Sequence, residues 1–141
     1  MRFLTFHVDY FWYKVTKKGR SKIIEEITED NKTNEVENAL VIFVSMEKSD
    51  ETKTEILEKG IDEIEKITKQ LKISNTVIIP FAHLFGQLST LEFAFESFKK
   101  IESMLKSKGY SVLRLPFGWF NELDMKAKGH PLSRISRIVK F

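Results

Sequence analysis

The sequence contains no cysteine, which excludes disulfide bonds, thiolate metal sites and a cysteine nucleophile. No apolar run approaches the roughly 20 residues that a helix needs to cross a bilayer. An acidic residue, Asp9, comes too early for a secretory signal peptide. Absence of cysteine is typical of a reducing compartment, so we expect a cytoplasmic protein that makes no contact with membrane.

Several motifs of common enzyme classes are also missing. There is no glycine-rich phosphate loop and no Gly-x-Ser-x-Gly turn that would present a nucleophilic serine. The three histidines, His7, His83 and His130, are far apart in sequence, and none has a partner at metal-ligand spacing. We therefore expect a protein that uses neither a metal nor a cofactor.

The composition is that of a globular chain. Its 141 residues include 42% hydrophobic and 30% charged residues, which favours one domain spanning residues 1–141. The formal net charge is only +3, but no acidic residue follows Asp124. Five cations do follow it, and they could hold a polyanion through phosphate contacts or simply form a lysine-rich surface. They are Lys126, Lys128, Arg134, Arg137 and Lys140.

Periodicity predicts alternating strands and helices. Residues 3–15 are expected to form a strand with Phe6, Val8, Tyr10 and Trp12 on one face. Apolar stripes at helical spacing predict helices over 55–71 and 90–106. Further strands are expected at 39–46, 75–80, 110–115 and 119–128, a loop or irregular strand at 21–37, and a helical turn or edge strand at 132–139.

This order indicates an α/β fold, a mixed β-sheet with helices packed on it. The strand–helix–strand units in the middle imply parallel pairing, and hairpin-like strands at both ends add antiparallel pairs. Pro80 and Pro116 each follow a strand, at the edge of the sheet where open α/β folds bind ligands. We expect the two turns to be neighbours and to form a small pocket lined by backbone groups, Phe81 and Phe117.

Six segments, taken together and in order, resemble the editing domain at the N-terminus of archaeal threonyl-tRNA synthetases, which shares the fold of D-aminoacyl-tRNA deacylases. The similarity covers the whole chain, although each short motif alone is weak. The segments are Arg2 to Tyr10 with His7-Val8-Asp9, Val44-Ser45-Met46-Glu47, Ile79-Pro80-Phe81-Ala82-His83-Leu84, Leu115-Pro116-Phe117-Gly118-Trp119, Lys128-Gly129-His130-Pro131-Leu132-Ser133 and Ile135-Ser136-Arg137.

The resemblance implies hydrolysis of serine wrongly attached to tRNA(Thr), usually by a homodimer. Serine lacks one methyl group of threonine, and a methyl group supports a discrimination of only about 1–3 kcal/mol, so a synthetic site alone makes errors. A second pocket that admits serine and rejects threonine would remove them. The chain has no room for a synthetase catalytic core, so it is expected to be an excised, stand-alone or truncated relative, or to work with a synthetase body.

The resemblance also implies roles for individual residues. Contact with the aminoacyl group is expected from Met46, Pro80, Phe81, Ala82, Phe117, Gly118, Phe120 and His7. Catalysis is expected from His83 and Asn121. Contact with the tRNA acceptor end, which carries the serine, is expected from Lys126, Lys128, His130, Arg134 and Arg137.

Four residues depart from the pattern of that family. Val8 replaces a serine, Phe120-Asn121 replaces tyrosine-lysine, and Arg134 replaces a glutamate. The usual lysine and glutamate are the side chains best suited to activating water, so two mechanisms stay open. Either His83 positions or deprotonates the water, or the terminal ribose 2′-OH positions it beside an oxyanion-stabilising backbone pocket. We favour the second, since it tolerates both replacements.

Two other functions stay open at this stage. Related deacylases remove D-amino acids from tRNA, so a D-aminoacyl-tRNA deacylase is one alternative. The other is a catalytically inactive tRNA-binding or dimerisation module, which the replacements at Asn121 and Arg134 favour.

Overall fold

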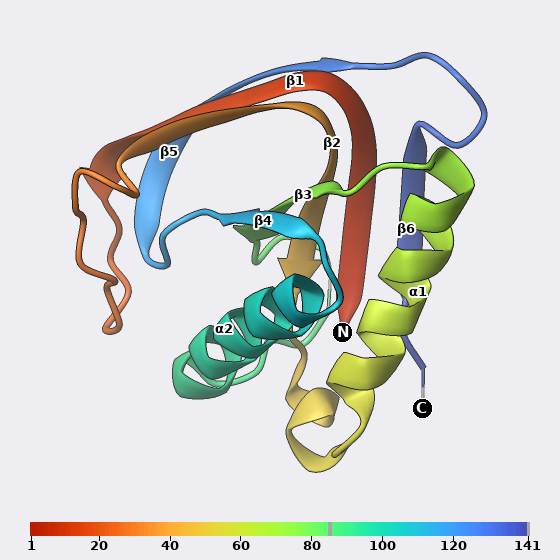
Figure 1. Ribbon diagram of the computed structural model, residues 1–141. Helices are drawn as coiled ribbons and strands as arrows, with labels where there is room; N and C mark the ends of the chain where they lie inside the picture. The colour runs from red at the N-terminus through yellow and green to blue at the C-terminus, as the bar shows by residue number, and fades with distance from the viewer. Residues whose placement is uncertain (85, 141) are drawn as a thin grey trace.

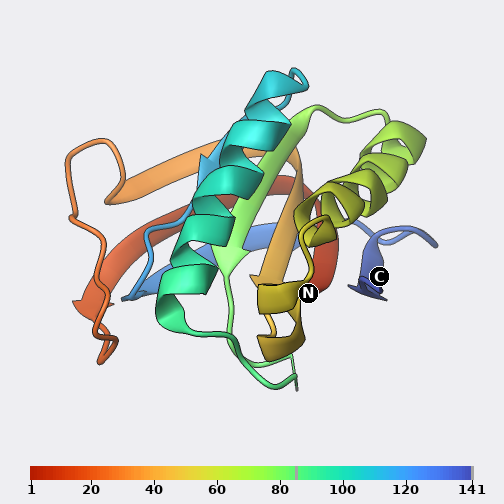
Figure 2. The same cartoon turned by 90° about the horizontal axis from the view of Figure 1, so that it is seen from below.

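The computed structural model describes residues 1–84 and 86–140 as a curled sheet with two helices on one face (Figure 1; Figure 2). None of the helices described there is long and apolar enough to cross a membrane. The elements are β1 (Arg2–Lys18), β2 (Thr33–Ser45), the 3-10 helix η1 (Lys48–Thr52), α1 (Ile56–Leu71), β3 (Asn75–Pro80), α2 (Leu91–Ser107), β4 (Ser111–Arg114), β5 (Trp119–Ala127) and β6 (Arg134–Ile138).

The predicted mixed sheet is confirmed. Its strand order is β4-β3-β2-β1-β5, and β6 pairs with the beginning of β1. β3 lies parallel to both β2 and β4, as the strand–helix–strand pattern predicts, and β1 is antiparallel to β2, β5 and β6. The segment left open as a helical turn or an edge strand is the strand β6, which covers Arg2–Phe6 of β1.

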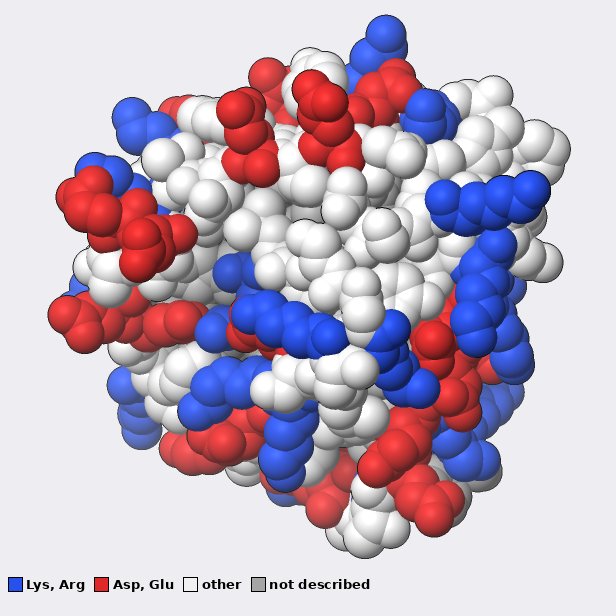
Figure 3. Space-filling model, viewed as in Figure 1, with Lys and Arg blue, Asp and Glu red and all other residues white. Residues whose placement is uncertain are grey.

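Both predicted helices form within a residue of their expected ends. Thr90 caps the N-terminus of α2, because its hydroxyl oxygen accepts a hydrogen bond from the Phe93 N–H at 3.2 Å. A positive-φ glycine, Gly109, follows the basic last turn of the helix. The molecular face in Figure 3 shows lysine and arginine interspersed with aspartate and glutamate.

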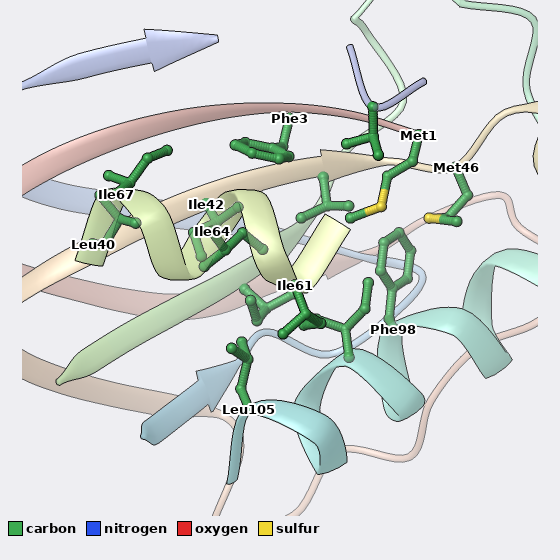
Figure 4. Packing of buried hydrophobic residues seen from close by; sticks show 14 of the residues in the cluster. Met1, Phe3, Leu40, Ile42, Met46, Ile61, Ile64, Ile67, Phe98 and Leu105 are labelled. Atoms are coloured by element: carbon green, nitrogen blue, oxygen red, sulfur yellow. The ribbon is translucent and has the colours of Figure 1, made fainter. Parts of the chain in front are cut away.

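Two hydrophobic clusters pack against opposite faces of the sheet. The first lies under the helices, where Ile61 and Ile64 of α1 and Phe98 of α2 meet Leu40 and Ile42 of β2 (Figure 4). The second contains Val8, Phe11, Tyr13, Ala39, Val41, Phe43, Val77, Ile79 and Leu115. Alternate residues of β2 therefore serve opposite clusters, which explains why its second half is apolar throughout.

The predicted faces of the first strand are wrong beyond Val8. Val8 packs in the second cluster, but Phe11 and Tyr13 continue there, whereas Tyr10 is exposed. The pairing of β1 with β5 shifts register between Val8 and Phe11, and the facing strand β2 has Asn38 at φ +47°. A bulge inserts an extra residue and exchanges the two faces, which strict alternation cannot anticipate.

Strand β2 begins at Thr33, six residues before the predicted start at residue 39. Its first half is polar because this part of the β1–β2 ribbon has only one buried face, so charged side chains such as Glu35 and Glu37 remain exposed. The 21–37 segment is therefore irregular only up to Lys32.

The α-ammonium group of Met1 is buried in an ion pair with Asp50. Its nitrogen lies 2.6 Å from Asp50 Oδ2 and 3.4 Å from Glu47 Oε1, and the Asp50 carboxylate also accepts the Glu47 N–H at 2.7 Å. Both the ammonium and the Asp50 side chain are shielded from solvent. The beginning of β1 is thus tied to the segment that follows β2.

We expect Asp50→Asn to lower the free energy of unfolding by about 2 kcal/mol. The amide would retain one acceptor but would turn an NH₂ donor toward either the ammonium or the Glu47 N–H. Urea denaturation would measure the effect, with Asp62→Asn on the exposed face of α1 as the control. Equal stability of the two variants would show that the buried pair contributes nothing.

Candidate functional site

The two predicted turns lie side by side and share one cavity of about 180 Å³. Pro80, Phe81 and Ala82 come from the end of β3, and Phe117 and Gly118 from the turn between β4 and β5. The prediction that these turns are neighbours is confirmed. The remaining lining residues are Ser21, Met46, Leu88, Ser89, Leu91, Ala94 and Phe98. Figure 2 shows the end of β3 beside the first turns of α2.

The cavity is apolar and uncharged. Among the described residues that line it, serine hydroxyls and main-chain groups are the only polar groups. The N–H groups of Ala82 and Gly118 donate no hydrogen bond among the described residues, although their neighbour Phe81 donates to Val44 O at 2.9 Å. Such groups can bind a carbonyl or an oxyanion. A cavity of this size has room for a small molecular group.

One wall of the cavity depends on the pairing of two loops. Ser89 N–H donates to Met46 O at 3.1 Å, and Lys48 N–H donates to Gln87 O at 2.7 Å. Glu47 and Leu88 form an isolated antiparallel bridge. Since Glu47 also approaches the Met1 ammonium, the buried N-terminus supports this wall.

The opposite wall requires two glycines. Gly19 N–H donates to Gly118 O at 2.8 Å, and a Cβ atom at Gly19 would lie 2.6 Å from that same oxygen. Gly118 has φ +88°, and a Cβ atom there would lie 2.7 Å from Ile23 O. The close approach of the two backbones therefore excludes any larger residue at either position.

Glu25 holds this wall in place through hydrogen bonds, a role that the sequence did not predict. Its carboxylate accepts two hydrogen bonds from Arg114, at 2.8 and 3.0 Å, and one from Phe117 N–H at 2.9 Å. Its carbonyl oxygen accepts the Trp119 indole N–H at 2.7 Å. Arg114 also donates to Glu102 of α2; although burial raises the pKa of Glu102, hydrogen bonds from Arg114 and Lys106 hold it below the usual value. A glutamate in a charged, irregular segment carries no local signal of such a role.

The expected catalytic side chains do not line the cavity. His83 is exposed, and its ring packs edge-on against Phe81 with centroids 5.5 Å apart. Phe120, 60% exposed, and Asn121 lie on β5 beyond Gly118, paired with Lys17 and Val15 of β1. Of the residues expected to contact the aminoacyl group, six line the cavity: Met46, Pro80, Phe81, Ala82, Phe117 and Gly118.

His7 and His130, expected to bind substrate and tRNA respectively, form a pair away from the cavity lining. Leu132 N–H donates to His130 Nδ1 at 3.2 Å, so the His130 proton is on Nε2, which lies 2.9 Å from His7 Nδ1. The remaining His7 proton then points from Nε2 to Asn38 Oδ1 at 3.2 Å. When both rings are neutral, each of their nitrogens therefore donates or accepts a hydrogen bond.

This pair holds the turn between β5 and β6 against β1. Two backbone hydrogen bonds join the same segments: Lys128 N–H donates to His7 O at 2.8 Å, and His7 N–H donates to Ser133 O at 2.9 Å. Burial lowers the pKa of His7, and the positive charge of Lys128 lowers it further; the hydrogen bond from His7 to Asn38 and the charge of Asp9 act in the opposite direction. The folded protein thus favours neutral His7.

We expect stability to fall as the pH drops from about 7 to about 5. The unfolded chain binds a proton on His7 at about pH 6.5, whereas the folded chain binds it only at a lower pH. The full stability is therefore present above about pH 6.5 and is lost progressively below it, with a slope of at most about 1.4 kcal/mol per pH unit.

Urea denaturation across this pH range would measure the loss, and His7→Gln should flatten it. His83→Gln is the matched control, since that ring lies exposed near the end of β3. A pH dependence that His7→Gln leaves unchanged would contradict this account.

The basic end of the chain is largely neutralised. Lys128 forms an ion pair with Asp9, Lys126 lies 4.0 Å from the same carboxylate, and Arg137 lies 3.9 Å from Glu63 of α1. Arg134 is exposed on β6, opposite Phe6. The expected tRNA contacts of this segment therefore stay a prediction. Within residues 1–84 and 86–140, no cluster of histidine and carboxylate side chains could hold a metal ion.

Sequence comparison places residues 1–139 in one family model, the archaea-specific editing domain of threonyl-tRNA synthetase. The chain is 41% identical over 140 residues to a threonine–tRNA ligase of Thermococcus sibiricus, and 42% identical over 140 residues to one of Methanocaldococcus jannaschii. Each match covers 99% of this chain and 22% of the ligase. The chain thus spans about a fifth of the length of these relatives.

Comparison with solved structures shows the fold. A c-Myc DNA unwinding element binding protein matches with a TM-score of 0.70 at 12% identity, covering 100% of both chains. At this identity the match carries no information on activity. It agrees with the D-aminoacyl-tRNA deacylase-like fold, a mixed sheet with helices packed on it, that the sequence motifs imply.

Proposed function

We propose that this chain, which belongs to the archaea-specific editing-domain family of threonyl-tRNA synthetase, hydrolyses serine from mischarged tRNA(Thr). The observation that carries the proposal is the small cavity between the Pro80–Ala82 and Phe117–Gly118 turns. Its walls are apolar side chains and main chain. At Gly19 and Gly118 the backbone is packed closely against neighbouring backbone, so this wall cannot move outward to accept a larger group. Such a site can admit serine and reject the additional methyl group of threonine.

In the proposed reaction, water attacks the ester carbonyl carbon and the bond to the terminal ribose oxygen breaks. That oxygen leaves with a proton, and free serine and tRNA(Thr) result. The terminal 2′-OH positions the water, and the N–H groups of Ala82 and Gly118 stabilise the negative charge that develops on the carbonyl oxygen. Positions 121 and 134, where this chain has Asn121 and Arg134, do not line the cavity, which supports a mechanism without them.

The proposal extends to the partners. The substrate is the acceptor end of tRNA(Thr) carrying serine, and the chain acts as a single editing domain, in the cytoplasm, as a homodimer. Since its relatives are about five times longer, the chain acts within or beside a threonyl-tRNA synthetase body.

A catalytically inactive tRNA-binding module is the second candidate. It is favoured by the exposed position of His83 and by the lack of a titratable side chain among the lining residues that the structure describes. D-aminoacyl-tRNA deacylation is a third possibility, since the fold is shared with those enzymes.

A deacylation assay with three substrates separates these functions. Purified protein would be mixed with Ser-tRNA(Thr), Thr-tRNA(Thr) and a D-aminoacyl-tRNA, and ester loss compared with a protein-free control. We expect turnover of the seryl ester only. Turnover of the D-aminoacyl ester alone would assign the deacylase function, and tRNA binding without turnover would assign the inactive module.

A further inference from the structure

Four cations at the end of β1 and in the turn after it form an exposed surface beside the cavity, here called the basic loop. They are Lys17, Lys18, Arg20 and Lys22, and all four are exposed. In the described part of the chain, none of them forms an ion pair. The basic end of the chain differs, because three of its cations face carboxylates.

The basic loop is fixed to the cavity wall. Gly19, between two of its cations, donates to Gly118 O, and Ser21 lines the cavity together with Gly118. Further along, Glu25 N–H donates to Phe117 O at 3.0 Å, so hydrogen bonds bracket the segment at both ends. Figure 2 shows this turn on the same side of the molecule as the end of β3 and the beginning of α2. The backbone that carries these cations is therefore held at a fixed position beside the cavity.

An exposed aromatic ring lies next to these charges. Phe120 is the partner of Lys17 across the β1–β5 pair, so the two side chains emerge on the same face of the ribbon. Lysine or arginine beside an exposed aromatic ring is the composition of surfaces that bind single-stranded nucleic acid, where phosphates meet cations and bases stack.

We propose that the basic loop binds the phosphates of the single-stranded 3′ end of tRNA, while the aminoacyl group enters the cavity. This inference rests on the proposed function. The acidic residues Glu26, Glu29 and Asp30 lie beyond Glu25 in the same connection, so they restrict the RNA path to the side of Lys17–Lys22.

The test compares three double variants, each of which removes two cations that form no described ion pair. Lys17→Ala/Lys18→Ala alters the basic loop, Arg134→Ala/Lys140→Ala alters the basic end of the chain, and Lys53→Ala/Lys100→Ala alters the helix face. Each variant would be titrated with tRNA(Thr) that carries no amino acid, over a range of salt concentrations. Each phosphate contact to a single strand contributes a slope of about 0.7 in log affinity against log salt.

For the basic-loop variant we expect the slope to fall by about 1.4, and tRNA affinity at about 0.1 M salt to fall about 25-fold relative to wild type. The helix-face variant should match wild type. A basic-loop variant with unchanged affinity and slope would overturn the inference, and a loss confined to the Arg134/Lys140 variant would place the RNA at the other end of the sheet.

A substrate without phosphates separates failure of the inference from failure of the proposed function. Seryl-adenosine should be hydrolysed equally by wild type and the basic-loop variant, whereas Ser-tRNA(Thr) should show a raised KM with unchanged kcat. If the basic-loop variant loses activity on both substrates equally, its cavity is damaged and no phosphate contact is shown, which contradicts the inference. If wild type hydrolyses neither ester but binds tRNA through the basic loop, the inference stands and the proposed function fails.

Discussion

Ala94→Leu is expected to lower the rate of Ser-tRNA(Thr) deacylation by at least about 100-fold. Ala94 faces the cavity from the first turns of α2. An isobutyl group there would occupy space that the seryl group needs, and a misplacement of about 1 Å at a reacting centre costs on the order of 100-fold. Leucine is a good helix former, so α2 should remain intact.

Single-turnover kinetics would measure this loss, with thermal unfolding as a check on the fold. Ser103→Leu is the matched control, because it places a leucine on the exposed face of the same helix. A folded Ala94→Leu protein that deacylates at the wild-type rate would show that the seryl group binds elsewhere. Ala94→Ser, which scarcely changes the volume, should keep most of the activity.

Removing the terminal 2′-OH of the tRNA is expected to slow deacylation by about 100- to 10,000-fold, the range typical of a lost proton-transfer or water-positioning group. His83→Ala is expected to cost less than about 10-fold, because its exposed ring contacts Phe81 and does not line the cavity. The two changes therefore test the two mechanisms directly.

The measurement is the enzymatic rate on 3′-seryl tRNA(Thr) ending in 2′-deoxyadenosine or in adenosine, each divided by its own uncatalysed rate. This division removes the intrinsic effect of the hydroxyl on ester reactivity. Equal enhancement of both esters would refute participation of the 2′-OH. A loss in His83→Ala as large as that of the deoxy substrate would instead assign water activation to the histidine.

The sequence predicts most of the sheet because the apolar patterns are unambiguous where strands are buried on both faces. The strand at Asn75–Pro80 has its exact predicted bounds, and both helices follow their apolar stripes. The neighbouring position of the Pro80 and Pro116 turns follows from parallel pairing, which brings the ends of β3 and β4 to one edge.

The features that could not be predicted depend on contacts between distant segments. The bulge after Val8 exchanges the faces of β1, and nothing in the local alternation marks it. Glu25 and Arg114 are 89 residues apart, and the ion pairs of Asp9 with Lys126 and Lys128 determine which cations remain exposed. Charge counted along the sequence therefore pointed to the basic end of the chain, where three of five cations face carboxylates, whereas none of the four cations of the basic loop forms an ion pair within residues 1–84 and 86–140.

The most direct measurement is a crystal structure of the protein with an amide analogue of seryl-adenosine, which cannot be hydrolysed. We expect the seryl side chain inside the cavity between Pro80 and Phe117, with the seryl carbonyl oxygen about 3 Å from the N–H groups of Ala82 and Gly118. An analogue bound with its seryl group outside this cavity, against Asn121 or Arg134, would contradict this expectation.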